Sequence, residues 1–394
     1  MSPPSIAIIG AGPAGLTLAR LLEVKGIDYV VFERDASPDI SNRAGGSLDI
    51  HPETGQHALR EAGLFEEFQK LARYEDTAMT IADKHGKRLL KGGEGQDRPE
   101  IDRLQLRQIL IVSIPHEKIK WGHGLVSASL DPESNKPVLT FSNEAKLSGF
   151  KLVVGADGAW SKLRSLITTS TPTYTGKSYI ETRITLTNPL HPTVASRMGA
   201  GMFIAIGDQK LVISQRQGDS SYRTYFGVSV PPGFFQSHSL SPQPNLTTEE
   251  TETNLRNILL SDRFFADWDE EYHSLIKNGT NFRPWPLYSL SKESITESWK
   301  SVPGLTLIGD AAHLCIPNGE GVNLAMTDAL RLAEAIAAYG VERVDKAVKE
   351  YEEDMFPRAI ETITEGWSMA DGMFGEGPEK LLAFMEMVAG GGER

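Results

Sequence analysis

The chain has 394 residues, of which 40% are hydrophobic and 23% are charged, and its formal net charge is −12. This length accommodates two domains, and the composition excludes long-range disorder and fibrous repeats. An acidic protein repels phosphate backbones and anionic lipid, so nucleic acid is not an expected partner. The one cysteine, Cys315, excludes an internal disulfide framework and a cysteine-based metal cluster.

No targeting segment or membrane span is predicted. The first apolar run, residues 6–9, ends at Gly10, whereas a secretory signal needs about 7–15 apolar residues after a basic start. No stretch reaches the roughly 20 apolar residues that span a bilayer. We therefore expect a protein of a reducing compartment, the cytoplasm, and we expect it to be a monomer.

The N-terminus predicts a strand, a turn, a helix and a second strand. Residues 6–9 and 29–32 are short apolar runs typical of buried parallel strands. Between them, a glycine-rich turn leads into a helix with a broad apolar face that ends near Gly26. This βαβ unit of about 30 residues predicts a Rossmann-like, doubly wound α/β sheet.

Later segments predict a second, β-rich domain inserted into the first. Short alternating runs at 201–206, 211–214 and 222–230 are typical of an antiparallel sheet. The other segments are assigned by the same patterns: helices at 99–114 and 322–339, strands at 151–156 and 305–310, a surface loop at 237–252, and a C-terminal helical region at 341–389. We predict a nucleotide-binding domain at 1–170 and 295–394, with a substrate-binding domain at 171–294.

The first motif is the turn Gly10-Ala11-Gly12-Pro13-Ala14-Gly15, of the form GxGxxG. Gly12 lets the backbone approach a pyrophosphate, and the following helix N-terminus offers free N–H groups to it. Glu33 ends the second strand, where a carboxylate binds ribose hydroxyls. The alternative is a tight turn without a ligand. Arg34 either lies over an adenine or pairs with Asp35.

Two further motifs follow predicted strands. Asp157 lies in Gly155-Ala156-Asp157-Gly158, which is either a nucleotide contact or a plain turn. Asp310 follows Gly309 at the end of the strand at 305–310, where its carboxylate can bind a ribityl hydroxyl. The subsequent turn, 317–323, leads into a helix and offers N–H groups to the electron-rich edge of a reduced flavin. The residues of this turn that are predicted to contact the cofactor are Gly319, Gly321, Val322 and Asn323.

These three motifs, in this order, resemble the class A FAD-dependent aromatic monooxygenases, the family of para-hydroxybenzoate hydroxylase. Stretches such as 45–49, 99–107 and 308–314 are most similar to the tetracycline-inactivating flavin monooxygenases of that family. The resemblance implies that Arg107 and Asp49 contact the flavin, together with Glu33, Arg34 and Asp310. It also places Arg43 near the flavin and NADPH.

The departures from the family fall on the substrate side. Glu181 stands where those enzymes have a substrate-binding Gln, and Tyr225 stands where they have a His. We therefore take Glu181 and Tyr225 as substrate-pocket candidates and leave the substrate open. The Gly-Gln-Gly turn of the family reads Gly319-Glu320-Gly321 here.

The resemblance implies an NAD(P)H-consuming monooxygenase that uses O₂ and hydroxylates an aromatic, enolic or polycyclic small molecule through a flavin C4a-hydroperoxide. NADPH would dock transiently, because no second dinucleotide motif is present. The alternatives are a flavin oxidase or dehydrogenase without oxygen transfer, and a flavin-bound module without turnover. The cofactor carries the chemistry, so no catalytic side chain is assigned. His313 is expected to pack behind the third motif, and no histidine pair has metal-ligand spacing.

Overall fold

The structure is a computed structural model that describes residues 4–39, 45–240 and 248–390. Its contacts divide the chain into two compact units. The first unit comprises Met1–Ala72, Ile101–Thr173 and Ser289–Gly366, and the second comprises Arg73–Glu100, Tyr174–Tyr288 and Trp367–Arg394. Each unit has its own hydrophobic core.

A five-stranded parallel sheet forms the centre of the first unit. Its order is β17 (Leu305–Leu307), β11 (Leu152–Gly155), β1 (Ile6–Ile9), β2 (Tyr29–Phe32) and β7 (Ile119–Lys120). The residues of β1, β2 and β11 are buried along the whole strand, as expected of parallel strands rich in β-branched residues. The strands predicted at 6–9 and 29–32 are confirmed to the residue.

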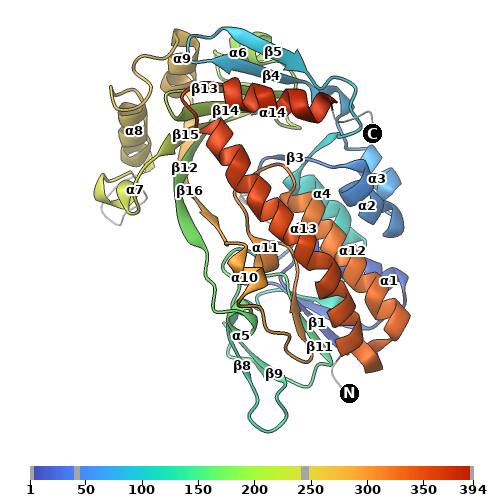
Figure 1. Cartoon of the computed structure of the whole chain (residues 1–394). Helices are drawn as coiled ribbons and strands as arrows, with labels where there is room; N and C mark the ends of the chain where they lie inside the picture. The colour runs from blue at the N-terminus through green and yellow to red at the C-terminus, as the bar shows by residue number, and fades with distance from the viewer. Residues whose placement is uncertain (1–3, 40–44, 241–247, 391–394) are drawn as a thin grey trace. The chain divides into compact units, whose positions relative to one another are not determined.

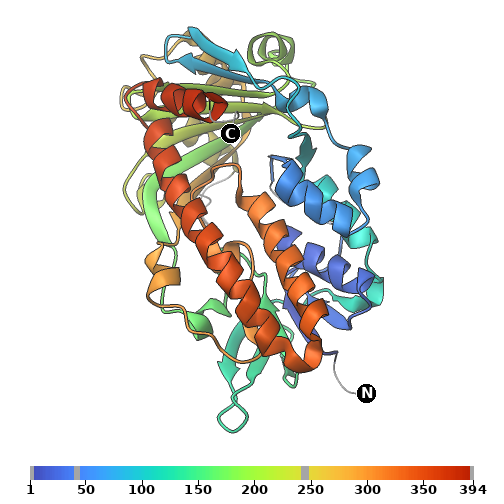
Figure 2. The ribbon, with the colours of Figure 1, turned by 45° about the vertical axis from the view of Figure 1, so that its right-hand side comes forward.

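Long helices cover this sheet. Helix α1 (Pro13–Val24) packs against α12 (Gly321–Tyr339), and the chain then turns through a short 3-10 segment (Val341–Arg343) into α13 (Val344–Met373) (Figures 1 and 2). The helix predicted at 322–339 is confirmed. The boundary between the two units falls inside α13, after Gly366.

The helix predicted at 99–114 is wrong at its start. Residues Glu100–Asp102 form a short strand, β6, and α4 covers only Arg103–Val112. The reason is a capping box, because Asp102 accepts from the third helical N–H while Gln105 reaches back to the backbone of Asp102. An apolar period alone cannot show this boundary.

The first unit contains further short elements. They are β3 (Ser47–Asp49), a π-helix (Pro52–Gln56), α2 (His57–Glu61), α3 (Phe65–Gln69), a 3-10 turn (His116–Lys118), β8 (Leu125–Leu130), β9 (Pro137–Phe141), β10 (Lys146–Leu147), α5 (Arg164–Ile167), α10 (Glu293–Thr296) and α11 (Asp310–His313). Strands β8, β9 and β10 form a separate antiparallel sheet.

A seven-stranded sheet forms the second unit. Its order is β16 (Thr280–Ser289), β12 (Thr173–Ile184), β15 (Tyr222–Ser229), β14 (Lys210–Arg216), β13 (Met202–Gly207), β4 (Met79–Asp83) and β5 (Arg88–Gly92). Strand β4 pairs parallel with β13, whereas β12, β13, β14 and β15 pair antiparallel. The predicted antiparallel sheet is thus extended by two strands from early in the chain, which makes it mixed.

The second unit also contains helices. They are α6 (His191–Met198), α7 (Phe234–Ser237), α8 (Thr248–Leu259), α9 (Glu270–Asn278) and α14 (Glu379–Gly390), with a 3-10 turn at Tyr74–Thr77. The surface loop predicted at 237–252 is wrong for 248–252, which begin α8, and 241–247 lie outside the described residues. Thr251, Leu255 and Leu259 recur every four residues and are buried, which accounts for the helix.

The predicted domain ranges differ from the two units. The sequence placed residues 73–100 and 367–394 in the nucleotide-binding domain, whereas they belong to the second unit. Hydrogen-bonded pairing of β4 with β13 accounts for the first difference. The assignment of FAD to one unit and of substrate to the other stays a prediction.

We predict that Gly15→Ala destabilises the apoprotein by about 1–3 kcal/mol, although Ala is the better helix former. A Cβ on Gly15 would lie 2.1 Å from the carbonyl oxygen of Gly10, which is backbone and cannot move aside. Gly12→Ala is the matched control, because no atom lies within 4 Å of its added Cβ. Urea denaturation of both variants measures the difference, and equal stabilities would contradict the prediction.

Candidate cofactor site and substrate face

The first motif forms the turn between β1 and α1. Glu33, at the end of β2, is 3% exposed and accepts from the backbone N–H of Ala11 at 2.6 Å and from that of Asp35 at 3.0 Å. The carboxylate therefore lies beside the glycine turn, as a ribose-binding carboxylate must. Gly12 is the N-cap of α1 in extended conformation, with open space around its Cβ position.

The three motifs meet at one edge of the parallel sheet. A Cβ built on Gly10 would lie 2.4 Å from the carbonyl oxygen of Ala156, in the second motif. A Cβ built on Gly309, in the third motif, would lie 3.2 Å from the Cβ of Ala14. Since β1, β11 and β17 are parallel neighbours, their carboxyl ends bring these turns together, which is where open α/β sheets bind ligands.

Arg107 braces the first turn. It is 4% exposed, and its Nε donates to the carbonyl oxygen of Ala11 at 3.0 Å while Nη2 pairs with Asp35 at 3.2 Å. Its guanidinium also lies 5.5 Å from the centre of the Trp121 ring. Asp35 pairs with Arg107, and Arg34 is exposed, so both alternatives for Arg34 stay predictions.

Arg164 joins the second and third motifs. Its Nε donates to the carbonyl oxygen of Ala311 at 2.8 Å, and Nη2 donates to that of Asp310 at 2.9 Å. Asp157 accepts from the N–H of Lys162, but its Oδ1 is buried without a partner among the described residues. Burial raises the pKa of Asp157. This orphaned oxygen, next to the glycine turn, suits a ligand hydroxyl.

Behind the third motif lies a buried charge network. Asp328 on α12 is 0% exposed, and its Oδ2 accepts from the N–H of Gly309 at 2.9 Å and contacts Nε2 of His313 at 2.5 Å. Arg358 on α13 reaches the other oxygen at 3.1 Å. His313 therefore packs behind the motif as expected, while the side chain of Asp310 is exposed at the sheet edge.

The turn before α12 is linked to the segment after β3. Asn323 accepts from the N–H of His51 at 2.9 Å and donates to the carbonyl oxygen of Asp49 at 3.0 Å. Gly321 and Val322 are the first residues of α12. Gly319 precedes them and has φ +89°, a conformation that favours glycine. A Cβ on Gly319 would lie 3.9 Å from Oδ2 of Asp49.

His51 is an ionisable group that the sequence did not single out. Its Nε2 lies 2.7 Å from Asp49 and its Nδ1 lies 3.2 Å from Glu320, and its side chain is 9% exposed. Burial opposes the ring charge, but hydrogen bonds to Asp49 and Glu320 outweigh burial and raise the pKa of His51 to about 9. Only the folded chain joins residues 51 and 320, so no local pattern could have revealed the pair.

These residues fit FAD. The open cradle at Gly12, the orphaned Oδ1 of Asp157 and the exposed carboxylate of Asp310 line the carboxyl edge of one sheet. Hydroxyl-accepting carboxylates and N–H-rich helix starts are what a dinucleotide requires. The predicted contact Arg43 lies outside the described residues.

On the seven-stranded sheet of the second unit, Glu181 belongs to a buried ion pair. Arg223 Nη1 lies 2.8 Å from Glu181 Oε1, and the Trp285 indole N–H donates to Oε2 at 2.9 Å. Glu181 and Arg223 are 7% and 1% exposed. Arg223 Nε has no partner among the described residues. Glu181 therefore lies between two donors.

Aromatic rings lie beside this pair. Tyr225 is opposite Glu181 in the β12–β15 register, and its ring centre is 5.7 Å from that of Tyr179. Tyr179 in turn stacks on Phe374 at 6.3 Å. Alternation along β12 and β15 places these residues on the face opposite the core residues Ile180 and Phe226. We call Tyr179, Glu181, Arg223, Tyr225 and Trp285 the candidate substrate face, because Glu181 and Tyr225 are the predicted substrate-pocket residues.

Arg223 was not predicted as a member of this face. Its position two residues before Tyr225 gives both side chains the same orientation, which was a usable signal. Its pairing with Glu181 depends on the strand register, which the sequence did not specify.

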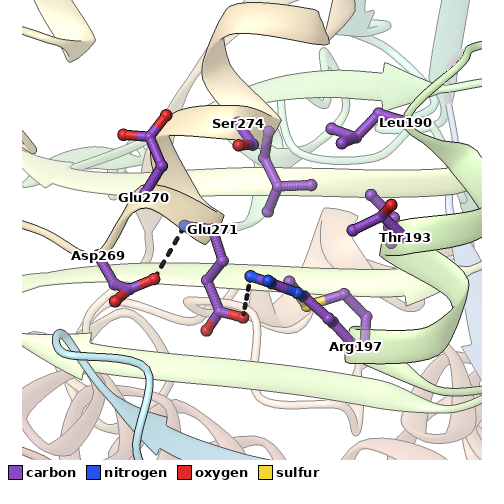
Figure 3. Close-up of a pocket in the computed structure, with 10 residues that line it drawn as sticks. Leu190, Thr193, Arg197, Asp269, Glu270, Glu271 and Ser274 are labelled. Atoms are coloured by element: carbon purple, nitrogen blue, oxygen red, sulfur yellow. Dashed lines mark hydrogen bonds and ion pairs between the residues drawn. The ribbon is translucent and has the colours of Figure 1, made fainter.

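A pocket of about 200 Å³ lies elsewhere in the second unit, between α6 and α9 (Figure 3). Its walls include Leu190, Val194 and Leu275, and its acidic side is the start of α9. There Asp269 accepts from the N–H of Glu271, which also pairs with Arg197 and Arg88. These polar groups already have partners, and no predicted site residue lines the pocket, so we assign it no ligand.

Two features are absent from the described part of the chain. No group of three or more His, Cys, Asp or Glu side chains is arranged to hold a metal ion. No helix in that part combines the length and apolarity needed to cross a membrane.

Comparison with known proteins identifies relatives along nearly the whole chain. The family described as FAD binding domain matches residues 4–365. The monooxygenase asqM of Emericella nidulans is 30% identical over 432 residues, which cover 96% of this chain and 97% of that protein.

Solved structures share the fold. HpxO of Klebsiella pneumoniae, complexed with FAD and uric acid, superposes with a TM-score of 0.75 at 20% identity and covers 97% of this chain and 92% of its own. The tetracycline destructase Tet(55) superposes with a TM-score of 0.71 at 20% identity, and the match covers 99% of this chain and 96% of that protein. At these identities the likeness shows a common fold.

We predict that the protein loses part of its free energy of unfolding at alkaline pH, because His51 loses its proton there. Its pKa is raised on folding, so its contribution is complete below pH about 6.5 and is lost as the pH rises through about 9. His51→Gln should therefore cost about 1–3 kcal/mol at pH 6 and much less at pH 10. Urea denaturation at both values measures this.

His57→Gln is the control for this prediction, because His57 pairs with Glu61 on an exposed surface. A cost for His51→Gln that is the same at both pH values would contradict the prediction.

Proposed function

The chain belongs to the FAD-binding-domain family of flavin-dependent monooxygenases, and on that premise we propose that it uses NAD(P)H and O₂ to hydroxylate an aromatic, enolic or polycyclic small molecule. One observation carries the proposal. Three turns from distant parts of the chain lie at the carboxyl ends of β1, β11 and β17, within side-chain contact of one another.

We propose the following roles for the first unit. Gly12 and the N-terminus of α1 bind the pyrophosphate, Glu33 binds the ribose, and Asp310 binds a ribityl hydroxyl. Arg107 also holds the backbone of Ala11 in place. The complete proposed set of cofactor contacts is Gly10, Gly12, Ala14, Gly15, Glu33, Arg34, Arg43, Asp49, Arg107, Asp157, Asp310, Gly319, Gly321, Val322 and Asn323.

When bound, FAD supplies hydride acceptance and oxygen activation. The chain's own contribution is a place at the start of α12 that stabilises the negative charge of a reduced cofactor. There the N–H groups of Gly321, Val322 and Asn323 have no acceptor within the helix. The candidate substrate face contributes orientation, because Glu181 accepts hydrogen bonds and Tyr225 offers a ring and a hydroxyl. A substrate with hydrogen-bond donors and a flat ring suits these groups.

The experiment is NAD(P)H oxidation by the FAD-loaded protein over a panel of phenols, enols and indoles under labelled O₂. NADPH and NADH are tested separately. We expect at least one compound to stimulate oxidation and to gain one labelled oxygen atom, read by mass spectrometry. Unlabelled product with stoichiometric peroxide would favour an oxidase instead. Flavin retention without stimulated oxidation would favour a module without turnover.

We predict that Glu181→Gln changes substrate preference while FAD content stays that of the wild type. Gln keeps one acceptor oxygen, which can serve Trp285 or Arg223 but not both, and it removes the charge. Glu181→Leu should also destabilise the fold by about 3–5 kcal/mol, because it leaves Arg223 buried without a counter-charge. Ratios of kcat/KM over the active compounds, together with thermal unfolding, measure both effects.

Glu270→Gln is the matched control, because Glu270 is 69% exposed and, among the described residues, pairs with His273 and Lys277. An unchanged substrate ratio in Glu181→Gln would remove Glu181 from the substrate site.

A further inference from the structure

The turn that starts α12 contains a carboxylate, although the turn is proposed to stabilise a negatively charged cofactor. Glu320 is the N-cap residue of this helix. The N–H groups that follow it are those proposed to face the reduced flavin, which carries negative charge. A carboxylate in that turn opposes such charge, whereas the Gln of the resembling enzymes is neutral.

Other carboxylates lie nearby. Asp49 approaches the same turn beside Gly319. Glu365 on α13 has its pKa raised by burial and by the charges of Glu361 and Glu320. Burial, with the charges of Asp310 and Glu320, raises the pKa of the Cys315 thiol to about 12. The surroundings of the turn are therefore strongly acidic.

His51 lies between two of these carboxylates. Both ring nitrogens are within hydrogen-bond distance of an acidic oxygen, Nε2 of Asp49 and Nδ1 of Glu320. A neutral imidazole carries one N–H, so only the imidazolium donates to both. The backbone N–H of His51 donates to Asn323, which ties the ring's position to α12.

The other elements packed around His51 place few charged side chains near its ring. On α12 the contacting side chain is the neutral Asn323. Arg60 on α2 donates to the carbonyl oxygen of Pro52 and to Gln56. Asp49 and Glu320 are thus the charged partners of His51 that the structure describes.

We propose that His51 is an electrostatic positioning residue for the flavin: held as an imidazolium between Asp49 and Glu320, it neutralises the carboxylate of the α12 turn and so allows this turn to stabilise the reduced, negatively charged cofactor. The inference rests on the proposed function, since it takes this turn to lie against the flavin. A purely structural role of His51 would change the stability of the protein, whereas the proposed role also changes the reduction potential of the flavin.

The test is a double-mutant cycle on the FAD-loaded protein with His51→Gln, Glu320→Gln and the combined variant. Midpoint potentials are measured at pH 7 against a reference dye, after FAD affinity has been determined for each protein. We expect His51→Gln to lower the equilibrium constant for flavin reduction at least tenfold, which is about 30 mV for a two-electron couple. Adding Glu320→Gln should restore the constant to within about threefold of the wild type, because the uncompensated carboxylate is then gone.

His57→Gln is the matched control, since it removes a histidine from an exposed pair in the same unit. It should leave the potential unchanged. A His51→Gln potential equal to that of the wild type, or a combined variant as low as His51→Gln, would overturn the inference. A wild type that binds no FAD would overturn the proposed function and the inference together, so the two failures are distinguishable.

A second measurement covers the case in which His51→Gln does not fold. Histidine-ring NMR titration of the wild type and Glu320→Gln compares the pH at which His51 loses its proton. We expect Glu320→Gln to lower that pH by about one unit or more, because one of the two stabilising carboxylates is lost. An identical titration in both proteins would contradict the pairing on which the inference depends.

Discussion

The close approach of backbone turns at the carboxyl edge of the parallel sheet is the constraint on which the rest of the structure depends. Gly10 lies against Ala156, Gly15 lies against the carbonyl of Gly10, and Gly309 lies against Ala14. The contacts of Gly10 and Gly15 are too close for a Cβ, and that of Gly309 is tight, so α1 packs against the sheet because these positions lack a side chain. The same closeness brings three polar turns to one edge, where a single long cofactor can contact them all.

Buried charge is the second organising element, and two buried ion-pair groups show how it acts. Asp328 binds the N–H of Gly309, His313 and Arg358, and so holds the third motif from behind. In the second unit, Glu181 and Arg223 form a pair of the same kind. A buried pair contributes little net stability, but losing one partner costs several kcal/mol, so such pairs specify geometry more than they stabilise.

Much of the fold was predictable, and the errors have physical causes. The strands at 6–9 and 29–32 and the helix at 322–339 have continuous apolar patterns and were predicted correctly. The start of α4 was wrong because a capping box at Asp102 decides it. Strand β4 was not predicted as part of the second sheet, because its partner β13 lies more than a hundred residues away and pairing carries no local signal. The individual cofactor and substrate contacts stay predictions.

The sequence by itself determined the family, the FAD motifs and the flavin-dependent monooxygenase class, because glycine spacing and strand-end carboxylates are encoded within short segments. Tertiary structure alone decided which charges meet: His51 with Glu320, Glu181 with Arg223, and Asp328 with Arg358. The reason is that strand register and helix packing join residues far apart in the chain, and a charge has its effect through the neighbours that folding provides.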